Sequence, residues 1–265
     1  MTAREALAEA ERRLAEAGVD TPRVDAEWLV AHLLRTTRSG IVGRLDDDVT
    51  GLEPLLARRV AREPLAYVLG EWGFRRLVLK TDARALVPRP ETETLVERAL
   101  LLVAALDEPR ILDVGIGSGA IALALKDERP DARVTGVDAS ADALALASEN
   151  AERLGLDVEL READGIAAAG EGWDLVVANP PYVESLAGLQ PELRFEPEAA
   201  LLGSGFHERI AAAAATRFLA LEVAAGEAQA VAATLRSIGY DRITITRDLT
   251  GTERVVEGER WTNRT

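Results

Sequence analysis

The residues best suited to carry chemistry are Asn179, Pro180, Pro181 and Tyr182, which follow one another in the chain. They come directly after an apolar run at 173–178 that predicts a buried strand. Each proline fixes its own φ and lacks an N–H donor, and Pro180 keeps Asn179 out of the helical region. We therefore expect a stiff corner that presents an amide, free carbonyls and an aromatic ring at the end of a strand.

Such a corner can hold a planar nitrogen for reaction. An amide or ring nitrogen is a poor nucleophile because its lone pair is delocalised. The Asn179 side-chain oxygen and the Pro180 carbonyl can accept the two N–H hydrogens of such a nitrogen, while Tyr182 packs over its plane. Positive charge that develops on the nitrogen is then stabilised by fixed acceptors. The corner alone indicates only that a planar nitrogen is bound.

A glycine-rich stretch indicates where a second ligand binds. Its residues are Asp113, Gly115, Ile116, Gly117, Ser118 and Gly119. They follow a predicted strand and open a predicted helix, where glycines allow a ligand to approach the backbone. Asp138 ends the next predicted strand, 23 residues after Gly115, which is the spacing of a carboxylate that binds ribose hydroxyls. Together these residues predict a nucleoside cofactor.

The spacing G-x-G-x-G, rather than G-x-G-x-x-G, argues against a dinucleotide. Asp113 would repel a pyrophosphate, but it suits the cationic α-amino group of S-adenosylmethionine. Asp164 follows a third predicted strand and can accept a hydrogen bond from the adenine amino group; the alternative is a solvated loop residue. Gly165 would let the adenine lie against the backbone.

The elements that must position these residues alternate between strands and helices. Strands are predicted at 110–114, 133–137, 158–161, 174–178, 218–223, 243–247 and 253–256, and helices at 91–105, 119–127, 141–154 and 226–238. This alternation predicts an α/β fold, a mostly parallel sheet with helices on both faces and an antiparallel hairpin at one edge. A small helical module is predicted from helices at 2–17, from Thr21-Pro22 onward, at 51–62 and at 64–69. Residues 72–88 predict a linking hairpin with its turn at Thr81 and Asp82.

Composition excludes several classes of protein. The 265 residues include no Cys and only two His, so we expect no disulfide and no metal site. No apolar run reaches 18 residues and the first residues do not form a signal peptide, so we expect a cytoplasmic protein without a membrane span. A net charge of −14 makes autonomous nucleic-acid binding a poor expectation.

With these residues in view, the chain resembles the release-factor glutamine methyltransferases. The resemblance covers nearly the whole chain, and its specific parts are residues 62–70, 86–93, 113–119, 179–183, 194–197 and 253–256. The Asn-Pro-Pro-Tyr motif also occurs in enzymes that methylate adenine amines, whereas the segment Pro-Arg-Pro-Glu-Thr-Glu at 88–93 is more selective. The segment from Gly205 to Arg217 is shorter than this family usually has.

The resemblance implies a Rossmann-like methyltransferase domain at 89–265, preceded by a helical domain at 1–70 and a β-hairpin linker at 71–88. We expect the helical domain to dock the substrate; the alternative is a helical cap that only stabilises the next domain. It implies S-adenosyl-L-methionine as cofactor, S-adenosyl-L-homocysteine as product, and peptide chain release factors as protein substrates. Arg89 and Glu91 are implied to bind the substrate, Thr92 the cofactor, and Asn179 both. We expect a monomer. The alternatives are a ribosomal-protein glutamine methyltransferase, a nucleic-acid adenine methyltransferase, and a cofactor-binding protein without activity.

Overall fold

The structure is a computed structural model that describes residues 1–183, 185 and 188–260. Its contacts divide the chain into two compact units. Unit 1 comprises Met1–Glu71 together with Gly188–Phe195, and unit 2 comprises Trp72–Ala187 and Glu196–Thr265. The second stretch of unit 1 therefore interrupts the sequence of unit 2.

Unit 1 is helical. Its elements are α1 (Ala3–Glu16), α2 (Pro22–Leu34), η1 (Ser39–Arg44), α3 (Leu52–Val60), α4 (Leu65–Leu69) and η2 (Pro191–Phe195). Thr2 and Glu5 form a capping box that satisfies the first N–H groups of α1. The buried side chains of Leu14, Leu29 and Leu56 form part of its core. The four predicted helices are confirmed, whereas η1 was not predicted.

Buried charges connect the two stretches of unit 1. The Arg59 guanidinium binds Asp25 at 2.7 Å, and both side chains are less than a tenth exposed. Glu192 of η2 binds Arg59 at 2.9 Å and Arg62 at 2.7 Å. Glu192 is partly buried, and its ion pairs with two arginines hold η2 on the helices of unit 1.

Unit 2 is built on a seven-stranded sheet with the order β5-β4-β3-β6-β7-β9-β8. Its strands are β3 (Arg110–Val114), β4 (Arg133–Asp138), β5 (Glu159–Glu162), β6 (Leu175–Ala178), β7 (Phe218–Glu222), β8 (Arg242–Arg247) and β9 (Glu253–Glu259). The first five in the order are parallel, and β9 runs antiparallel to β7 and β8. The predicted parallel sheet with an antiparallel edge hairpin is confirmed.

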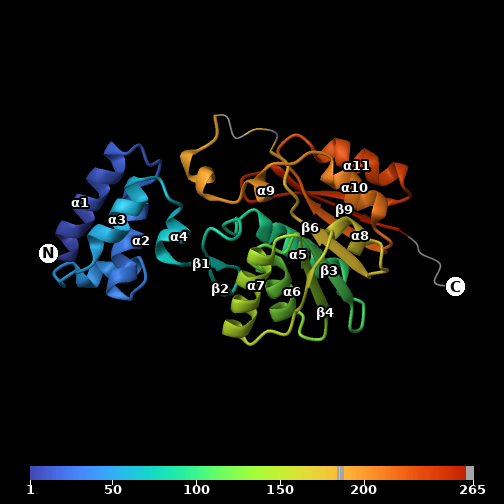
Figure 1. Cartoon of the computed structure of the whole chain (residues 1–265), viewed down its shortest axis with the longest axis horizontal. Coiled ribbons are helices and arrows are strands. Elements are labelled where there is room, and N and C mark those ends of the chain that lie inside the picture. Colours follow the sequence, from blue (N-terminus) through green and yellow to red (C-terminus); the bar gives the residue numbers. More distant parts are fainter. Residues whose placement is uncertain (184, 186–187, 261–265) are drawn as a thin grey trace. The chain divides into compact units, whose positions relative to one another are not determined.

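Helices cover both faces of the sheet (Figure 1). One hydrophobic cluster includes buried residues of α5 (Thr92–Leu102), α6 (Ala120–Glu128) and α7 (Ala141–Leu154). The other includes buried residues of α8 (Gly165–Ala169), α10 (Phe206–Ala213) and α11 (Ala228–Ser237). Every residue of β6 and β7 is buried between these layers, as expected for the centre of a parallel sheet.

The short segment before β7 still forms structure. It contains α9 (Glu198–Leu201) and α10, whose Ile210 and Ala211 are buried in the second cluster. The Nε2 atom of His207 lies 2.7 Å from the Glu222 carbonyl oxygen. The shortened segment therefore covers this face of the sheet.

The linking hairpin is present, but the predicted position of its turn was wrong. The small hairpin consists of β1 (Glu71–Phe74) and β2 (Leu77–Lys80), so the chain reverses at Arg75 and Arg76 rather than at Thr81 and Asp82. Arg75 adopts a positive φ of 50°, which is costly for a residue with a Cβ. Its N–H donates to Glu93 at 2.9 Å and its guanidinium binds Glu128, so tertiary bonds offset the local strain.

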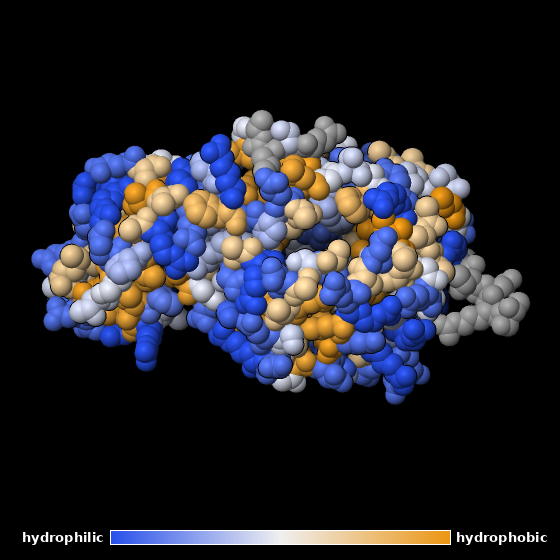
Figure 2. Space-filling model, in the orientation of Figure 1, coloured by the Kyte–Doolittle hydropathy of each residue, from blue (hydrophilic) through white to orange (hydrophobic). Residues whose placement is uncertain are grey.

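The surface is mostly polar on the face shown in Figure 2. Hydrophilic residues cover most of this face, and hydrophobic residues form separate small areas. No helix of the described residues has both the length and the apolar character that crossing a membrane requires.

Candidate active site

The predicted ligand-binding segments leave the sheet at one edge. Val114 of β3 is level with Val137 of β4 and with Ala178 of β6, and Ala178 is level with Leu221 of β7. The residues that follow these strand ends therefore meet at the carboxyl edge of the sheet, where α/β folds bind ligands.

The glycine-rich loop is held by its neighbour strand. Gly115 and Ile116 donate N–H bonds of 2.9 and 3.0 Å to the Val137 carbonyl. Gly117 donates its N–H to the Asp138 carboxylate at 3.0 Å. The loop therefore lies beside Asp138, the residue predicted to bind the ribose hydroxyls. The other Asp138 oxygen accepts from the N–H of Ser140 at 3.0 Å.

The backbone of the loop needs its glycines. Gly115, Gly117 and Gly119 have φ values of 76°, 54° and 88°, a region that L side chains rarely adopt. A Cβ on Gly115 would meet no atom within 4 Å, so the space above this residue is open. The Ser118 carbonyl accepts from the Asn150 side chain at 2.9 Å, which fixes the end of the loop.

Asp113 lies beneath this loop with no exposed surface. Its Oδ2 accepts the Ala122 N–H at 3.1 Å, whereas Oδ1 has no hydrogen-bond partner among the described residues. Burial raises the pKa of this carboxyl to about 7, the Ala122 bond lowers it, and Asp138 raises it further. The contact of Asp113 with a ligand amine stays a prediction, and the structure places this side chain fully buried with one unpaired oxygen.

Asp164 and Gly165 follow β5. Asp164 is exposed and caps α8, because its Oδ1 accepts the Ile166 N–H at 2.9 Å. This helix cap was not predicted. A Cβ on Gly165 would lie 2.4 Å from Val114 Cγ1, so glycine is needed for the close approach of α8 to β3.

Asn179 is joined to the start of α5. Its side-chain Nδ2 donates to the Thr92 hydroxyl at 3.3 Å. Within the part of the chain that the structure describes, neither Asn179 Oδ1 nor the Pro180 carbonyl oxygen accepts a hydrogen bond. The corner therefore presents two acceptors, while one of the two N–H hydrogens of the Asn179 amide is already used.

The remaining predicted substrate residues lie around this corner. Tyr182 is partly buried, and burial raises the pKa of its phenol. Arg89 binds the buried Glu196, whose other oxygen accepts the Val87 N–H at 3.0 Å. Arg89 and Glu91 both act electrostatically on Tyr182, but no hydrogen bond joins either to Asn179 among the described residues.

The corner after Tyr182 is tied to the segment that follows α9. Val183 donates its N–H to Leu201 at 3.0 Å and its carbonyl accepts from Gly203 at 3.0 Å. A Cβ on Gly203 would lie 3.0 Å from Pro181 Cγ, so Gly203 permits close contact with the second proline.

Glu222 is a residue that the sequence analysis missed as part of the site. It ends β7 with only 1% of its surface exposed, and burial raises the pKa of its carboxyl to about 7. The available signal was a charged residue that closes an otherwise apolar strand.

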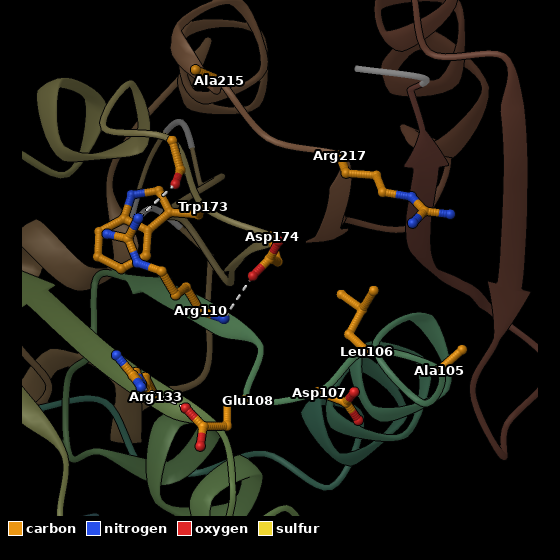
Figure 3. Close-up of a pocket in the computed structure, with 11 residues that line it drawn as sticks. Ala105, Leu106, Asp107, Glu108, Arg110, Arg133, Trp173, Asp174, Ala215 and Arg217 are labelled. Atoms are coloured by element: carbon orange, nitrogen blue, oxygen red, sulfur yellow. Dashed lines mark hydrogen bonds and ion pairs between the residues drawn. The ribbon is translucent and has the colours of Figure 1, made fainter. Parts of the chain in front are cut away.

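A separate cavity lies at the opposite edge of the sheet (Figure 3). It is lined by residues at the amino ends of the strands, including Arg110, Asp174 and Arg217. Arg110 donates its N–H to Asp174 at 2.9 Å, and its guanidinium lies 4.8 Å from the centre of the Trp173 ring. None of the predicted site residues lines this cavity, so it does not indicate the active site.

Comparison with known proteins agrees with this architecture. The family model described as PrmC N-terminal domain matches residues 5–70, and the one described as Methyltransferase small domain matches residues 94–195. The catalytic domain of hMettl16 in complex with MAT2A 3'UTR hairpin 1 has a TM-score of 0.57 and 15% identity, and covers 79% of this chain and 82% of its own. At this identity the likeness concerns the fold alone.

Two relatives match over almost their full length. The release factor glutamine methyltransferase of Deinococcus radiodurans is 40% identical over 278 residues, covering 98% of this chain and 99% of the relative. That of Vibrio cholerae is 38% identical over 287 residues, covering 100% of this chain and 99% of the relative. The chain therefore belongs to the release factor glutamine methyltransferase family.

Proposed function

We propose that this chain transfers a methyl group from S-adenosylmethionine to the side-chain nitrogen of the glutamine in the Gly-Gly-Gln motif of peptide chain release factors. One observation carries the proposal: Asn179 Oδ1 and the Pro180 carbonyl are adjacent acceptors, and neither is used within the described chain. A primary amide has two N–H hydrogens that match these two acceptors. Membership of the family supports the choice of glutamine.

The cofactor would bind at the glycine-rich loop. The open space above Gly115 and the buried, unpaired Asp113 oxygen fit a ligand that brings positive charge close to the backbone. Asp138 would bind the ribose hydroxyls, and Asp164 with Gly165 would border the adenine. Thr92 and Asn179 would lie beside the methyl group. When bound, S-adenosylmethionine supplies an electrophilic methyl group, and S-adenosylhomocysteine is the product.

The corner lowers the barrier by orientation and by charge. Asn179 and Pro180 hold both N–H hydrogens of the substrate amide, so the face of its nitrogen points in one direction. Partly buried Tyr182 packs over the amide plane and limits its rotation. As the nitrogen becomes positive, its N–H groups bind the two acceptors more strongly, which stabilises the transition state more than the bound substrate.

Methyl transfer from labelled S-adenosylmethionine to a release factor tests the proposal. We expect labelling of the intact release factor and none of a variant with Ala in place of the motif glutamine. Equal labelling of both proteins would refute the assigned acceptor. Arms with a ribosomal protein and with bare nucleic acid test the alternatives, and methylation of either in preference to the release factor would overturn the proposal. A release-factor substrate also implies a cytoplasmic enzyme, which we propose acts as a monomer.

Asn179→Ala tests the role of the corner. Removing one fixed acceptor is expected to lower kcat on the order of 10²–10³-fold. Cofactor binding, measured by calorimetry, is expected to stay largely intact. The matched control is Gln229→Ala, which removes an exposed amide from α11. Near-normal turnover by Asn179→Ala would contradict the assigned role.

A further inference from the structure

Asn150 is a buried polar residue that the proposed chemistry does not yet use. It lies on α7 with no exposed surface, on a face whose other buried residues, Ala143, Leu146 and Ala147, are apolar. Asparagine is a poor residue for the interior of a helix, and burying its amide is costly unless hydrogen bonds satisfy it. The presence of Asn150 on this face therefore needs an explanation from its contacts.

Asn150 joins two segments that are distant from it in the sequence. Its Oδ1 accepts the N–H of Lys80 at 2.7 Å, and its Nδ2 donates to the Lys80 carbonyl at 3.1 Å. The same Nδ2 donates to the Ser118 carbonyl at 2.9 Å. Both N–H hydrogens of the amide are therefore used. Only one orientation of the amide fits, because one of the three backbone groups is a donor and the other two are acceptors.

Lys80 ends the linking hairpin, and the segment after it passes beside the glycine-rich loop. The Lys80 ammonium binds Glu149 of α7 at 2.6 Å, and the Arg84 guanidinium binds the same carboxylate at 2.7 Å. Ala85 is buried, and a Cβ on Gly117 would lie 3.9 Å from the Ala85 Cβ. Helix α7 therefore holds this segment against the loop that is proposed to bind the cofactor.

We infer that Asn150 is a positioning residue that couples residues 80–85 to the glycine-rich loop, so that the cofactor binds tightly only while the two are joined. This inference rests on the proposed function, in which the loop binds S-adenosylmethionine. The first residues of the loop are fixed by β4, where Val137 and Asp138 accept N–H bonds from them. At the Ser118 end, the Asn150 side chain supplies the corresponding hydrogen bond.

The coupling follows from the burial of the Asn150 amide. If Ser118 or Lys80 moves away, a buried N–H of Asn150 loses its acceptor, and leaving a buried donor without a partner is costly. The two segments are therefore stabilised together. A ligand that holds the glycine-rich loop in place also stabilises the end of the hairpin, because coupling between two sites is reciprocal.

Asn150→Leu tests the inference. Leucine branches as asparagine does and suits both a helix and a buried position, but it removes all three hydrogen bonds. Coupling typically changes an affinity about 5–150-fold, so we expect calorimetry on the full chain to show cofactor binding weakened at least about fivefold. The KM for the release factor at saturating cofactor is expected to stay unchanged, because its binding residues are not altered. A smaller loss of cofactor affinity in the folded variant would overturn the inference.

Thr216→Val is the matched control. Thr216 is buried, and its hydroxyl donates to the Phe218 carbonyl at 3.1 Å, at the opposite edge of the sheet. Valine also removes a buried hydrogen bond and keeps the shape of the side chain. It is expected to lower stability in urea unfolding and to leave cofactor affinity unchanged. Equal weakening of cofactor binding in the two variants would show that lost stability, rather than lost coupling, is the cause.

Hydrogen exchange of the wild-type chain tests the coupling even if Asn150→Leu fails to fold. When S-adenosylmethionine is added, we expect exchange of the Lys80 N–H to slow together with exchange of the loop amides. The Arg75 N–H, which donates to Glu93 at the turn of the same hairpin, is the internal control and is expected not to change. Slowing in the loop alone, or equal slowing at Lys80 and Arg75, would contradict the inference.

The outcomes separate the two proposals. A wild-type chain that binds S-adenosylmethionine but does not methylate the release factor refutes the proposed function, and both binding tests of Asn150 stay valid. Methylation by the wild-type chain together with unchanged cofactor affinity of Asn150→Leu refutes the role of Asn150 alone. A wild-type chain that does not bind S-adenosylmethionine refutes both.

Discussion

Replacing Asp113 by Asn is expected to make the stability of unit 2 less dependent on pH. The pKa of this fully buried carboxyl is raised from 3.8 to about 7 in the folded protein, chiefly by burial. The folded state therefore holds a proton that the unfolded state loses between these values. Stability falls as the pH rises through this window, and the loss is complete above about pH 7.

The size of the effect follows from the shift. One pKa unit corresponds to about 1.36 kcal/mol, so the full rise costs about 4 kcal/mol of unfolding free energy above pH 7. Between pH 5 and pH 8 the loss is about 3 kcal/mol. Asn has nearly the same shape, keeps the acceptor for the Ala122 N–H and does not titrate. The variant should therefore gain about 3 kcal/mol relative to wild type over this interval.

Urea unfolding of the full chain at the two pH values measures the gain. The transition of unit 2 is followed for wild type and for Asp113→Asn, and the difference between the two proteins is compared at pH 5 and pH 8. Taking this difference removes the contributions of all other titrating groups. A difference that is the same at both pH values would show that burial does not control the ionisation of Asp113.

Two further substitutions test how the loop and unit 1 are held. Gly136→Ala places a Cβ about 2.0 Å from Ile116 Cδ1, so we expect a loss of about 1–3 kcal/mol and weaker cofactor binding by calorimetry. Gly73→Ala, whose Cβ meets no atom within 4 Å, is its control, and equal effects would argue against the crowding. Glu192→Gln removes the charge that binds Arg59 and Arg62, and is expected to destabilise unit 1 by about 2–3 kcal/mol in urea unfolding. An unchanged midpoint would mean that these ion pairs do not fix η2.

The parts of the fold that depend on local pattern could be predicted from the sequence. The strand β6 could be predicted from its apolar run, because a buried strand accepts only apolar residues. The loop after β3 could be predicted from its glycines, because positive φ favours glycine. The bounds of β3 and α7 match the predicted ranges 110–114 and 141–154.

The parts of the fold that depend on partners distant in the sequence could not be predicted in this way. The turn at Arg75 is stabilised by Glu128, which is 53 residues away in the sequence. Glu222 reaches the end of β6 only because β7 pairs with β6, and Glu192 belongs to unit 1 because of Arg59 and Arg62. No local pattern reports such pairs, since each residue alone reads as an ordinary charge.

The origin of the segment Gly188–Phe195 has a consequence for dissecting this enzyme. The chain leaves unit 2 before Gly188, contributes η2 to unit 1, and returns at Glu196. Cutting the sequence after residue 70 therefore does not separate two independent pieces. The fragment that contains unit 2 would keep residues 188–195 of unit 1. Its Glu192 carboxylate would lose its two partners, Arg59 and Arg62. If such a fragment were inactive, the cause could equally be the unpaired segment 188–195 or the loss of a surface that docks the substrate.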